Sequence, residues 1–317
     1  MTVCNDSISR KVIVTGASGF IGSRLIKELI SCGYYVLAII RPNSQNKDKI
    51  IKEKNVKIIE CDLKNISQLP YLIESKNIDV FYHLAWEGSS GESRNDYKTQ
   101  MQNVTYSVDC LKVACALNIK RFISIGTIAE RLMENIDMME NISMSAMYSI
   151  TKDYTHKLLN AISKQNHIEF VWCRLSNIYG PGDNTSNIIN YTITHVLENK
   201  KTEYSIGNQP CNMLYIDDCI DALARIGNTQ IINRHTYFIG GLEIRSVKYF
   251  VERTKYFINP DVKLGWGQRK NDGIIYKPEW LGTWEIQDDF GFMAKTDFDR
   301  GIQKTIEWKL NSQNIQA

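Results

Sequence analysis

Short runs of apolar, often β-branched residues alternate with amphipathic stretches along the first half of the chain. The runs cover residues 12–14, 36–40, 56–59, 80–84 and 122–125, and a further run at 169–173 follows a helical pattern over 148–163. Apolar strands buried on both faces and separated by helices are typical of βαβ units. The pattern therefore predicts an α/β fold around a parallel sheet.

Beyond Gly180 this rhythm weakens and the predicted loops lengthen, which indicates a second region. The chain has 317 residues with 43% hydrophobic and 23% charged residues, an ordinary globular composition. We find no internal repeat and no low-complexity linker, so the second region is expected to lie directly against the first.

Composition and charge exclude several classes of partner. The net charge is +3 with both signs interspersed, so we expect no nucleic-acid partner. The 8 cysteines form no CxxC pair and have no histidine at metal spacing, which predicts reduced thiols and no metal site. The start of the chain is polar and the longest apolar run, near 34–40, is too short for a bilayer. We therefore expect a cytoplasmic protein without a membrane partner.

A glycine-rich loop follows the first predicted strand. It reads Thr15-Gly16-Ala17-Ser18-Gly19-Phe20-Ile21-Gly22 and runs directly into a helix. Glycines allow a tight turn and a close approach of the backbone to a pyrophosphate, whose charge the helix start favours. The spacing is GxxGxxG, and its alternative interpretation is an ordinary strand–helix turn. We expect the loop to bind a dinucleotide through Gly16, Ser18, Gly19, Phe20, Ile21 and Gly22.

Two residues at later strand ends bear on the choice of cofactor. The second strand ends in Arg41. An acidic residue at this place would accept a hydrogen bond from the ribose 2′-hydroxyl of NAD(H), whereas a cation suits the 2′-phosphate of NADP(H). We favour NADP(H), with NAD(H) as the alternative if Arg41 is only a solvated arginine. Asp62, after the third strand, either accepts from the adenine amino group or caps a helix.

Candidate catalytic residues lie further along the chain. Tyr148 and Lys152 form YxxxK in a helical pattern, so both side chains share one face. An ammonium beside a phenol favours phenolate, which predicts a lowered pKa for Tyr148 and proton transfer at an alcohol or ketone. Thr127 follows the fifth strand at the carboxyl end, where parallel sheets collect ligands, and is expected to bind the same substrate oxygen; its alternative role is a strand-end cap.

These residues together resemble the extended short-chain dehydrogenase/reductase family, in its nucleotide-sugar epimerase, dehydratase and reductase branch. The resemblance covers nearly the whole chain. The motifs that carry it are Gly16-x-x-Gly19-x-x-Gly22, Asp62-Leu63, His83-Leu84-Ala85, Asn103, Thr127, Tyr148-x-x-x-Lys152, Arg174-Leu175-Ser176-Asn177-Ile178-Tyr179-Gly180-Pro181-Gly182 and Tyr215-Ile216-Asp217-Asp218.

The resemblance implies a Rossmann-like doubly wound parallel sheet, a smaller carboxyl-terminal domain that holds a nucleoside diphosphate sugar, and a homodimer formed through a helix bundle. We expect residues 1–175 to form the dinucleotide-binding domain, with 210–240 returning to it. Residues 176–209 and 241–317 are expected to form the substrate domain.

By position, the resemblance implies roles for individual residues. Tyr148 is the acid/base, Lys152 its partner and a ribose ligand, and Thr127 the substrate-oxygen ligand. Leu63, Leu84 and Ala85 are expected at the cofactor. Asn177 is implied as a ligand of the sugar diphosphate or, alternatively, a turn residue, and Asp217 and Asp218 are implied to be structural.

Two departures from the family pattern narrow the reaction. Members that catalyse 4,6-dehydration carry Asp-Glu directly after the catalytic Thr, whereas Thr127 is followed by Ile128 and Ala129. Before Tyr215, where many members have a diphosphate-binding arginine, this chain reads Cys211-Asn212-Met213. Arg269 is the candidate replacement, although it is equally compatible with a surface position.

The aromatic residues Trp266, Tyr276, Trp280 and Trp284 either stack on a base or sugar or form a small core.

The sequence therefore predicts an NAD(P)H-dependent reductase of a nucleoside-diphosphate 4-keto (deoxy) sugar in surface-polysaccharide or deoxysugar synthesis. The alternative is an NAD-dependent nucleotide-sugar 4-epimerase that uses the same residues. A catalytically idle nucleotide-binding sensor or scaffold is a third class. The combination of Thr127, Tyr148 and Lys152 argues against it.

Overall fold

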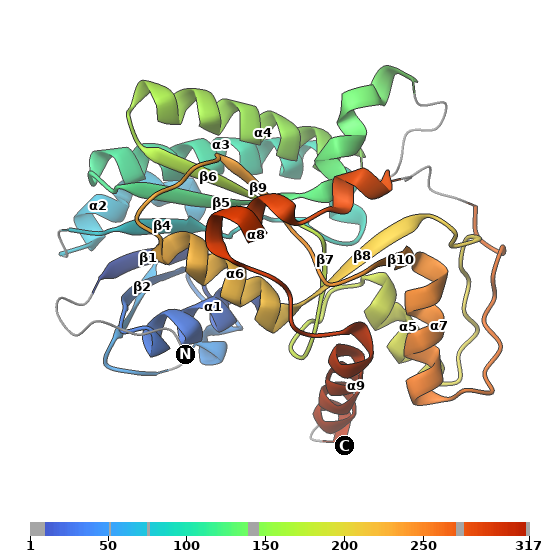
Figure 1. Ribbon diagram of the computed structural model, residues 1–317. Coiled ribbons are helices and arrows are strands. Elements are labelled where there is room, and N and C mark those ends of the chain that lie inside the picture. The colour runs from blue at the N-terminus through green and yellow to red at the C-terminus, as the bar shows by residue number, and fades with distance from the viewer. Residues whose placement is uncertain (1–9, 51, 75–76, 139–145, 271–275, 315–317) are drawn as a thin grey trace.

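The structure is a computed structural model that describes residues 10–50, 52–74, 77–138, 146–270 and 276–314 (Figure 1). Its strands are β1 Lys11–Thr15, β2 Tyr35–Ile40, β3 Val56–Glu60, β4 Val80–His83, β5 Arg121–Thr127, β6 Glu169–Leu175, β7 Asn177–Tyr179, β8 Pro210–Tyr215, β9 Thr236–Ile239 and β10 Ile244–Ser246. Its α-helices are α1 Phe20–Ser31, α2 Leu69–Leu72, α3 Tyr97–Ala116, α4 Ala146–Gln165, α5 Ile188–Leu197, α6 Ile216–Asn228, α7 Val247–Ile258, α8 Trp284–Phe290 and α9 Phe298–Asn314. The 3-10 helices are η1 Lys47–Lys49, η2 Leu63–Gln68, η3 Glu92–Asn95, η4 Ile128–Met138 and η5 Pro278–Leu281.

Seven strands form the central sheet in the order β3-β2-β1-β4-β5-β6-β9, and every neighbouring pair is parallel. Each of the six predicted strands is present within two residues of its expected ends. The strand order reverses direction between β1 and β4, so their carboxyl ends open a crevice where ligands bind in doubly wound folds. The predicted α/β class with a Rossmann-like sheet is confirmed.

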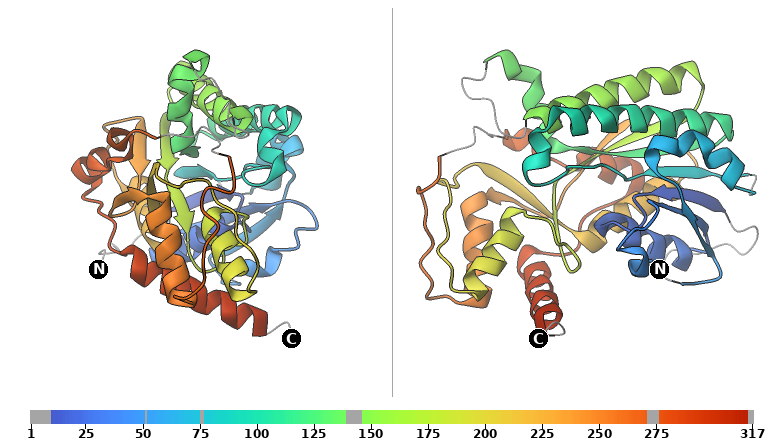
Figure 2. Two further views of the ribbon diagram at one scale, coloured as in Figure 1. Left: turned by 90° about the vertical axis from the view of Figure 1, so that its right-hand side faces the viewer. Right: turned by 180° about the vertical axis from the view of Figure 1, so that it is seen from behind.

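Alternate side chains of the strands enter two different cores. Val12, Val14, Tyr82 and Ile123 belong to the core beneath α1 and α6, whereas Ile13, Phe81 and Phe122 belong to the core beneath α3 and α4. Figure 2 shows these helix pairs on opposite sides of the sheet. Because both faces are covered, the strands read as continuous apolar runs, which explains the pattern seen in the sequence.

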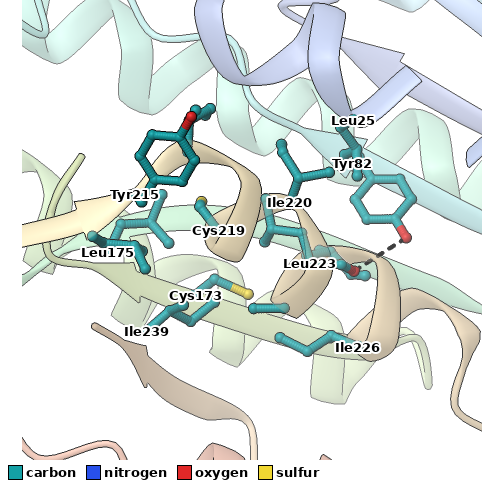
Figure 3. Packing of buried hydrophobic residues seen from close by; sticks show 14 of the residues in the cluster. Leu25, Tyr82, Cys173, Leu175, Tyr215, Cys219, Ile220, Leu223, Ile226 and Ile239 are labelled. Atoms are coloured by element: carbon teal, nitrogen blue, oxygen red, sulfur yellow. Dashed lines mark hydrogen bonds between the residues drawn. The ribbon is translucent and has the colours of Figure 1, made fainter. Parts of the chain in front are cut away.

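Helix α6 buries one apolar face in the core that it shares with α1 (Figure 3). Its Cys219, Ile220, Leu223 and Ile226 are all at most 5% exposed and face the sheet and α1. The Tyr82 hydroxyl donates to the Leu223 carbonyl oxygen at 3.4 Å, which satisfies a polar group inside this core.

A second sheet of three strands, in the order β10-β8-β7, lies past the carboxyl end of β6 (Figure 1). Helices α5 and α7 lie beside this small sheet. The segment 210–240, expected to return to the first domain, is divided: β8 joins the small sheet, α6 lies against α1, and β9 completes the large sheet beside β6. The predicted domain boundaries stay a prediction.

None of the seven described cysteines forms a disulfide, which agrees with the expected reduced thiols, and five of the seven are buried. No helix within the described ranges is both long and apolar enough to cross a membrane. Those ranges also hold no group of three or more His, Cys, Asp or Glu side chains placed to bind a metal ion.

Candidate active site

A cleft of about 490 Å³ opens at the carboxyl ends of β4, β5 and β6. Three kinds of predicted residue meet there. The side next to the glycine loop is lined by Phe20, Ile21, Leu84 and Ala85. The centre is lined by Thr127, Tyr148 and Lys152. The side next to the small sheet is lined by Asn177. Residues as far apart in the chain as Phe20 and Asn177 thus share one cavity.

The glycine loop is shaped as a dinucleotide site requires. Gly16 has φ +67°, and a Cβ at this position would lie 2.8 Å from the Ala85 amide nitrogen. A Cβ at Gly22 would lie 2.2 Å from the Gly16 carbonyl oxygen. Gly19 caps α1 without a side-chain hydrogen bond, so the helix start receives no side-chain acceptor there. The backbone fits a pyrophosphate at the helix N-terminus.

Other predicted cofactor residues lie around this loop. Arg41 follows the end of β2 with an exposed side chain, and the Ser18 hydroxyl lies 3.1 Å from that of Ser44. Asp62 caps η2, because its carboxylate accepts from the Lys64 backbone N–H at 3.0 Å, so the capping alternative describes its contact. Leu63 begins η2 and is half-buried against the α3 side of the sheet.

Helix α4 brings Tyr148 and Lys152 to the cleft on one face, and β5 ends there with Thr127. Tyr148 is 8% exposed and Lys152 4%. The Lys152 ammonium donates to the Ile125 carbonyl oxygen at 2.7 Å and lies 3.6 Å from the centroid of the Trp86 ring. The structure therefore brings the three predicted catalytic side chains together, with Lys152 directed at Trp86 and the end of β5.

The electrostatics of Tyr148 differ from the prediction. Burial raises the pKa of Tyr148 above its ordinary value of 10.0; the positive charge of Arg94 and a hydrogen bond with Thr127 work in the opposite direction. The predicted lowering of the Tyr148 pKa by Lys152 is wrong for this structure. The Lys152 ammonium lies 5.9 Å from the ring centroid, whereas the Arg94 guanidinium carbon lies 4.2 Å from it.

Lys152 is itself perturbed by its surroundings. Burial lowers its pKa from 10.5 to about 7, the charge of Glu130 raises it, and the charge of Arg94 lowers it further. Lys152 is not among the groups that shift the pKa of Tyr148, which burial dominates, so the simple YxxxK argument fails here.

Glu130 was missed by the sequence reasoning. It lies in η4, three residues after Thr127, and its carboxylate has no solvent exposure. It accepts from the Thr127 backbone N–H at 2.6 Å, from Trp172 Nε1 at 2.9 Å and from Arg174 Nε at 2.8 Å. The sequence offered one signal for this ion pair. Glu130 follows two apolar residues after β5, and Arg174 lies in β6, the neighbouring strand.

His83 and Asn103, which contributed to the resemblance, make structural contacts. His83 hydrogen-bonds with Thr15 at 2.9 Å and Ser107 at 3.0 Å, and burial lowers its pKa to about 3, so it is neutral at pH 7. The Asn103 amide donates to the Glu87 carbonyl oxygen and accepts from its N–H, both at 2.8 Å, which holds the loop after β4.

The model of the NAD dependent epimerase/dehydratase family matches residues 12–240. This chain belongs to that family. The resemblance identified from the motifs, including the nucleotide-sugar branch of the extended short-chain dehydrogenases, is therefore confirmed. Family membership makes the chain a member of a class of nicotinamide-dependent enzymes.

Three relatives each cover at least 95% of this chain. CDP-abequose synthase of Salmonella muenchen is 27% identical over 310 residues, which cover 95% of this chain and 99% of that protein. UDP-glucose 4-epimerase of Thermotoga maritima, solved with UDP-glucose, has a TM-score of 0.80 at 20% identity and covers 96% of this chain and 99% of its own. UDP-N-acetylglucosamine 4-epimerase of Methanobrevibacter ruminantium has a TM-score of 0.81 at 20% identity, covering 96% and 100%. These two structures share the fold.

The residues that depart from the family pattern have clear positions. Cys211 and Asn212 are buried in β8, where the Asn212 amide donates to the Gly241 and Glu243 carbonyl oxygens at 3.1 Å. Arg269 lies outside the main cleft, in an adjoining hollow of about 280 Å³. Both cavities are lined by Ser186, Asn187 and Ile188, so the hollow continues the cleft.

The aromatic segment of the sequence is divided between the two alternatives. Trp266 lines the hollow, with its ring 4.7 Å from that of Tyr204. Trp280 packs in a small core, Tyr276 contacts that core and also lines the cleft, and Trp284 is 58% exposed.

Asp217 and Asp218, which follow β8, make structural contacts, as the resemblance implied. Asp217 forms an ion pair with Arg24 at 2.9 Å, and the Asp218 carboxylate accepts from the Lys295 and Thr296 backbone N–H groups at 3.1 and 3.0 Å.

The Glu130 contacts generate a stability prediction. Glu130→Ala removes the acceptor of three donors and leaves Arg174 as a poorly exposed, unpaired charge, so the free energy of unfolding should fall by about 3–5 kcal/mol. Urea denaturation at pH 7 measures this change. The control is Glu60→Ala, which breaks the exposed ion pair with Lys47 and should cost at most about 1 kcal/mol. Equal losses in both variants would contradict a special role for Glu130.

The lowered pKa of Lys152 predicts a pH dependence of stability. Between pH 7 and 9 the unfolded chain keeps a proton on Lys152 that the folded chain has released, so its contribution to the free energy of unfolding rises with pH. Below pH 7 both states are protonated and the contribution is constant at its lowest. The wild type should gain about 2 kcal/mol relative to Lys152→Met from pH 7 to pH 9. Urea denaturation of both proteins at the two pH values tests this, and a constant difference would refute it.

Proposed function

We propose that this protein is an NAD(P)H-dependent reductase acting on the keto group of a nucleoside-diphosphate 4-keto sugar. The observation that carries the proposal is the supply of proton-transfer groups in the cleft. Thr127 and Tyr148 are present, but the two residues after Thr127 are the buried apolar Ile128 and Ala129, each 3% exposed. The nearby carboxylate, Glu130, is held by three donors. Proton donation at one oxygen suffices for ketone reduction, whereas elimination of water needs a further acid and base.

The chain's own residues supply binding and proton transfer. A bound nicotinamide dinucleotide supplies the hydride that adds to the sugar carbonyl carbon. Tyr148 donates its hydroxyl proton to the carbonyl oxygen, and Thr127 donates a hydrogen bond to the same atom. The raised pKa of Tyr148 keeps the phenol protonated near neutral pH, which suits the direction of reduction. Lys152 holds the end of β5 through Ile125 and is the expected ribose ligand.

The cavities support a nucleotide-linked substrate. The hollow next to the cleft carries Arg269 and Lys270, two cations suited to a diphosphate, and Trp266 for stacking. Asn177 begins β7 of the small sheet and lines the cleft, which supports its implied role at the sugar diphosphate. A relative named CDP-abequose synthase supports a nucleoside-diphosphate sugar as the substrate class. The homodimer implied by the resemblance stays a prediction.

Arg41 supports NADP(H) over NAD(H). The chain has an arginine at the end of β2 where an acceptor for the ribose hydroxyl would otherwise stand. Among the described residues no carboxylate forms an ion pair with it, so its guanidinium is available to a 2′-phosphate.

The reaction type is tested with purified protein, UDP-, CDP- and dTDP-linked 4-keto-6-deoxyglucose, and NADPH or NADH. The reductase should consume one reduced cofactor per sugar, measured by the loss of nicotinamide absorbance. Tyr148→Phe removes the proton donor and should lower kcat by roughly 10²–10⁴ with the cofactor still bound. The matched control is Tyr154→Phe on the same helix, with a half-exposed ring, which should leave kcat unchanged.

An epimerase uses the same Thr127, Tyr148 and Lys152 but regenerates its cofactor in each cycle. Interconversion of two 4-epimeric nucleotide sugars without added NADPH would therefore replace the reductase assignment. Conversion of an intact nucleotide hexose to its 4-keto-6-deoxy form would contradict the argument from Ile128 and Ala129.

The cofactor preference is tested with Arg41→Asp. Reversing the charge at the adenosine ribose should shift the ratio of NADPH to NADH affinity at least tenfold toward NADH, since a charge-assisted phosphate contact contributes about 1.5–3 kcal/mol. Fluorescence titration with both cofactors measures the ratio. Arg245→Asp, an exposed arginine outside both cavities, serves as control. Tighter binding of NADH than NADPH by the wild type would overturn the NADP(H) assignment.

A further inference from the structure

An arginine lies against the ring of the candidate catalytic tyrosine. Arg94 belongs to η3, the short helix after β4, and lines the cleft. Its guanidinium carbon lies 4.2 Å from the centroid of the Tyr148 ring, on whose face it forms a cation–π contact. The ring of Trp86 lies perpendicular to that of Tyr148, with 6.1 Å between the ring centroids. Arg94 and Trp86 therefore cover Tyr148 from the loop that follows β4.

The hydrogen-bonding capacity of Arg94 is largely unused. Nη1 donates to the Ser89 carbonyl oxygen at 3.2 Å, whereas Nε is buried and has no hydrogen-bond partner. No ion pair joins Arg94 to a carboxylate within the described part of the chain. Across those same residues, only one other buried side-chain polar atom, Asn160 Oδ1, lacks a partner.

Such a donor is costly unless a ligand satisfies it. Buried polar groups without a partner are rare in folded proteins, and each costs about 1–3 kcal/mol or more when charged. Arginine has five N–H donors in a rigid plane, and the Arg94 guanidinium lies over the Tyr148 ring. The unused donors are thus held beside the phenol that is expected to protonate the substrate.

We propose that Arg94 is a substrate-binding residue that donates to an oxygen of the sugar next to the reacting carbon. This inference rests on the proposed nucleotide-sugar substrate and specifies one of its contacts. The geometry favours the sugar over the diphosphate, because Arg94 stacks on Tyr148, whereas Arg269 and Lys270 line the adjoining hollow. The same charge opposes the effect of burial on the pKa of Tyr148, so Arg94 also moderates the acidity of the proton donor.

The test compares affinities and needs no turnover. Calorimetry would measure binding of UDP-, CDP- and dTDP-glucose and of the matching free nucleoside diphosphates to the protein loaded with oxidised cofactor. Arg94→Met should weaken the best-bound nucleotide sugar roughly tenfold or more and leave the free nucleoside diphosphate unchanged. Arg94→Lys keeps the charge but lacks the planar donor set, so it should recover only part of the affinity. Arg245→Met is the matched control, and thermal unfolding checks that each variant is folded.

The outcomes separate this inference from the proposed function. Equal losses for the nucleotide sugar and the free diphosphate would place Arg94 at the diphosphate and overturn the proposal, as would unchanged affinity for both. Failure of the wild type to bind any of the three nucleotide sugars would overturn the substrate class and this inference with it. A selective loss in Arg94→Met without reductase activity in the wild type would support the sugar contact and reject the reaction type alone.

Discussion

Parallel pairing of β1 with β4 and of β4 with β5 is the constraint on which the rest of the molecule depends. It aligns the carboxyl ends of these strands, so the glycine loop after β1, the loop after β4 and Thr127 at the end of β5 meet at one edge. Burial of both faces by two helix pairs makes that register rigid, because a one-residue slip would exchange the two cores.

The chemistry of the cleft is set by charges that lie around the tyrosine and lysine. Glu130 is held behind the end of β5, and Arg94 lies across the face of Tyr148. Their charges act in opposite directions on Tyr148 and Lys152, and burial dominates both residues. The electrostatic surroundings of Tyr148 and Lys152 therefore depend on how the loops after β4 and β5 pack against α4, more than on the four-residue spacing of YxxxK.

A second feature of the cleft is the close packing at the end of β5. Gly126 lies where any Cβ would come within 2.6 Å of both Glu130 and Trp172, so the chain at the end of β5 is closely confined. Within this space Ile128 and Ala129 turn apolar side chains into the structure and Glu130 is engaged by its donors. This packing supports the proposed reduction, in which one substrate oxygen is protonated and the rest of the cleft binds the sugar and its diphosphate.

The sequence by itself determined the parallel sheet, the glycine loop and the pairing of Tyr148 with Lys152, because these depend on local periodicity and on spacing within one loop or helix. Only the tertiary structure decided that Lys152 points to Trp86, that Arg94 covers Tyr148 and that Glu130 lies beneath Thr127. Those contacts join loops and strands far apart in the chain. Their effect on pKa depends on burial and charge in three dimensions, which no linear spacing encodes.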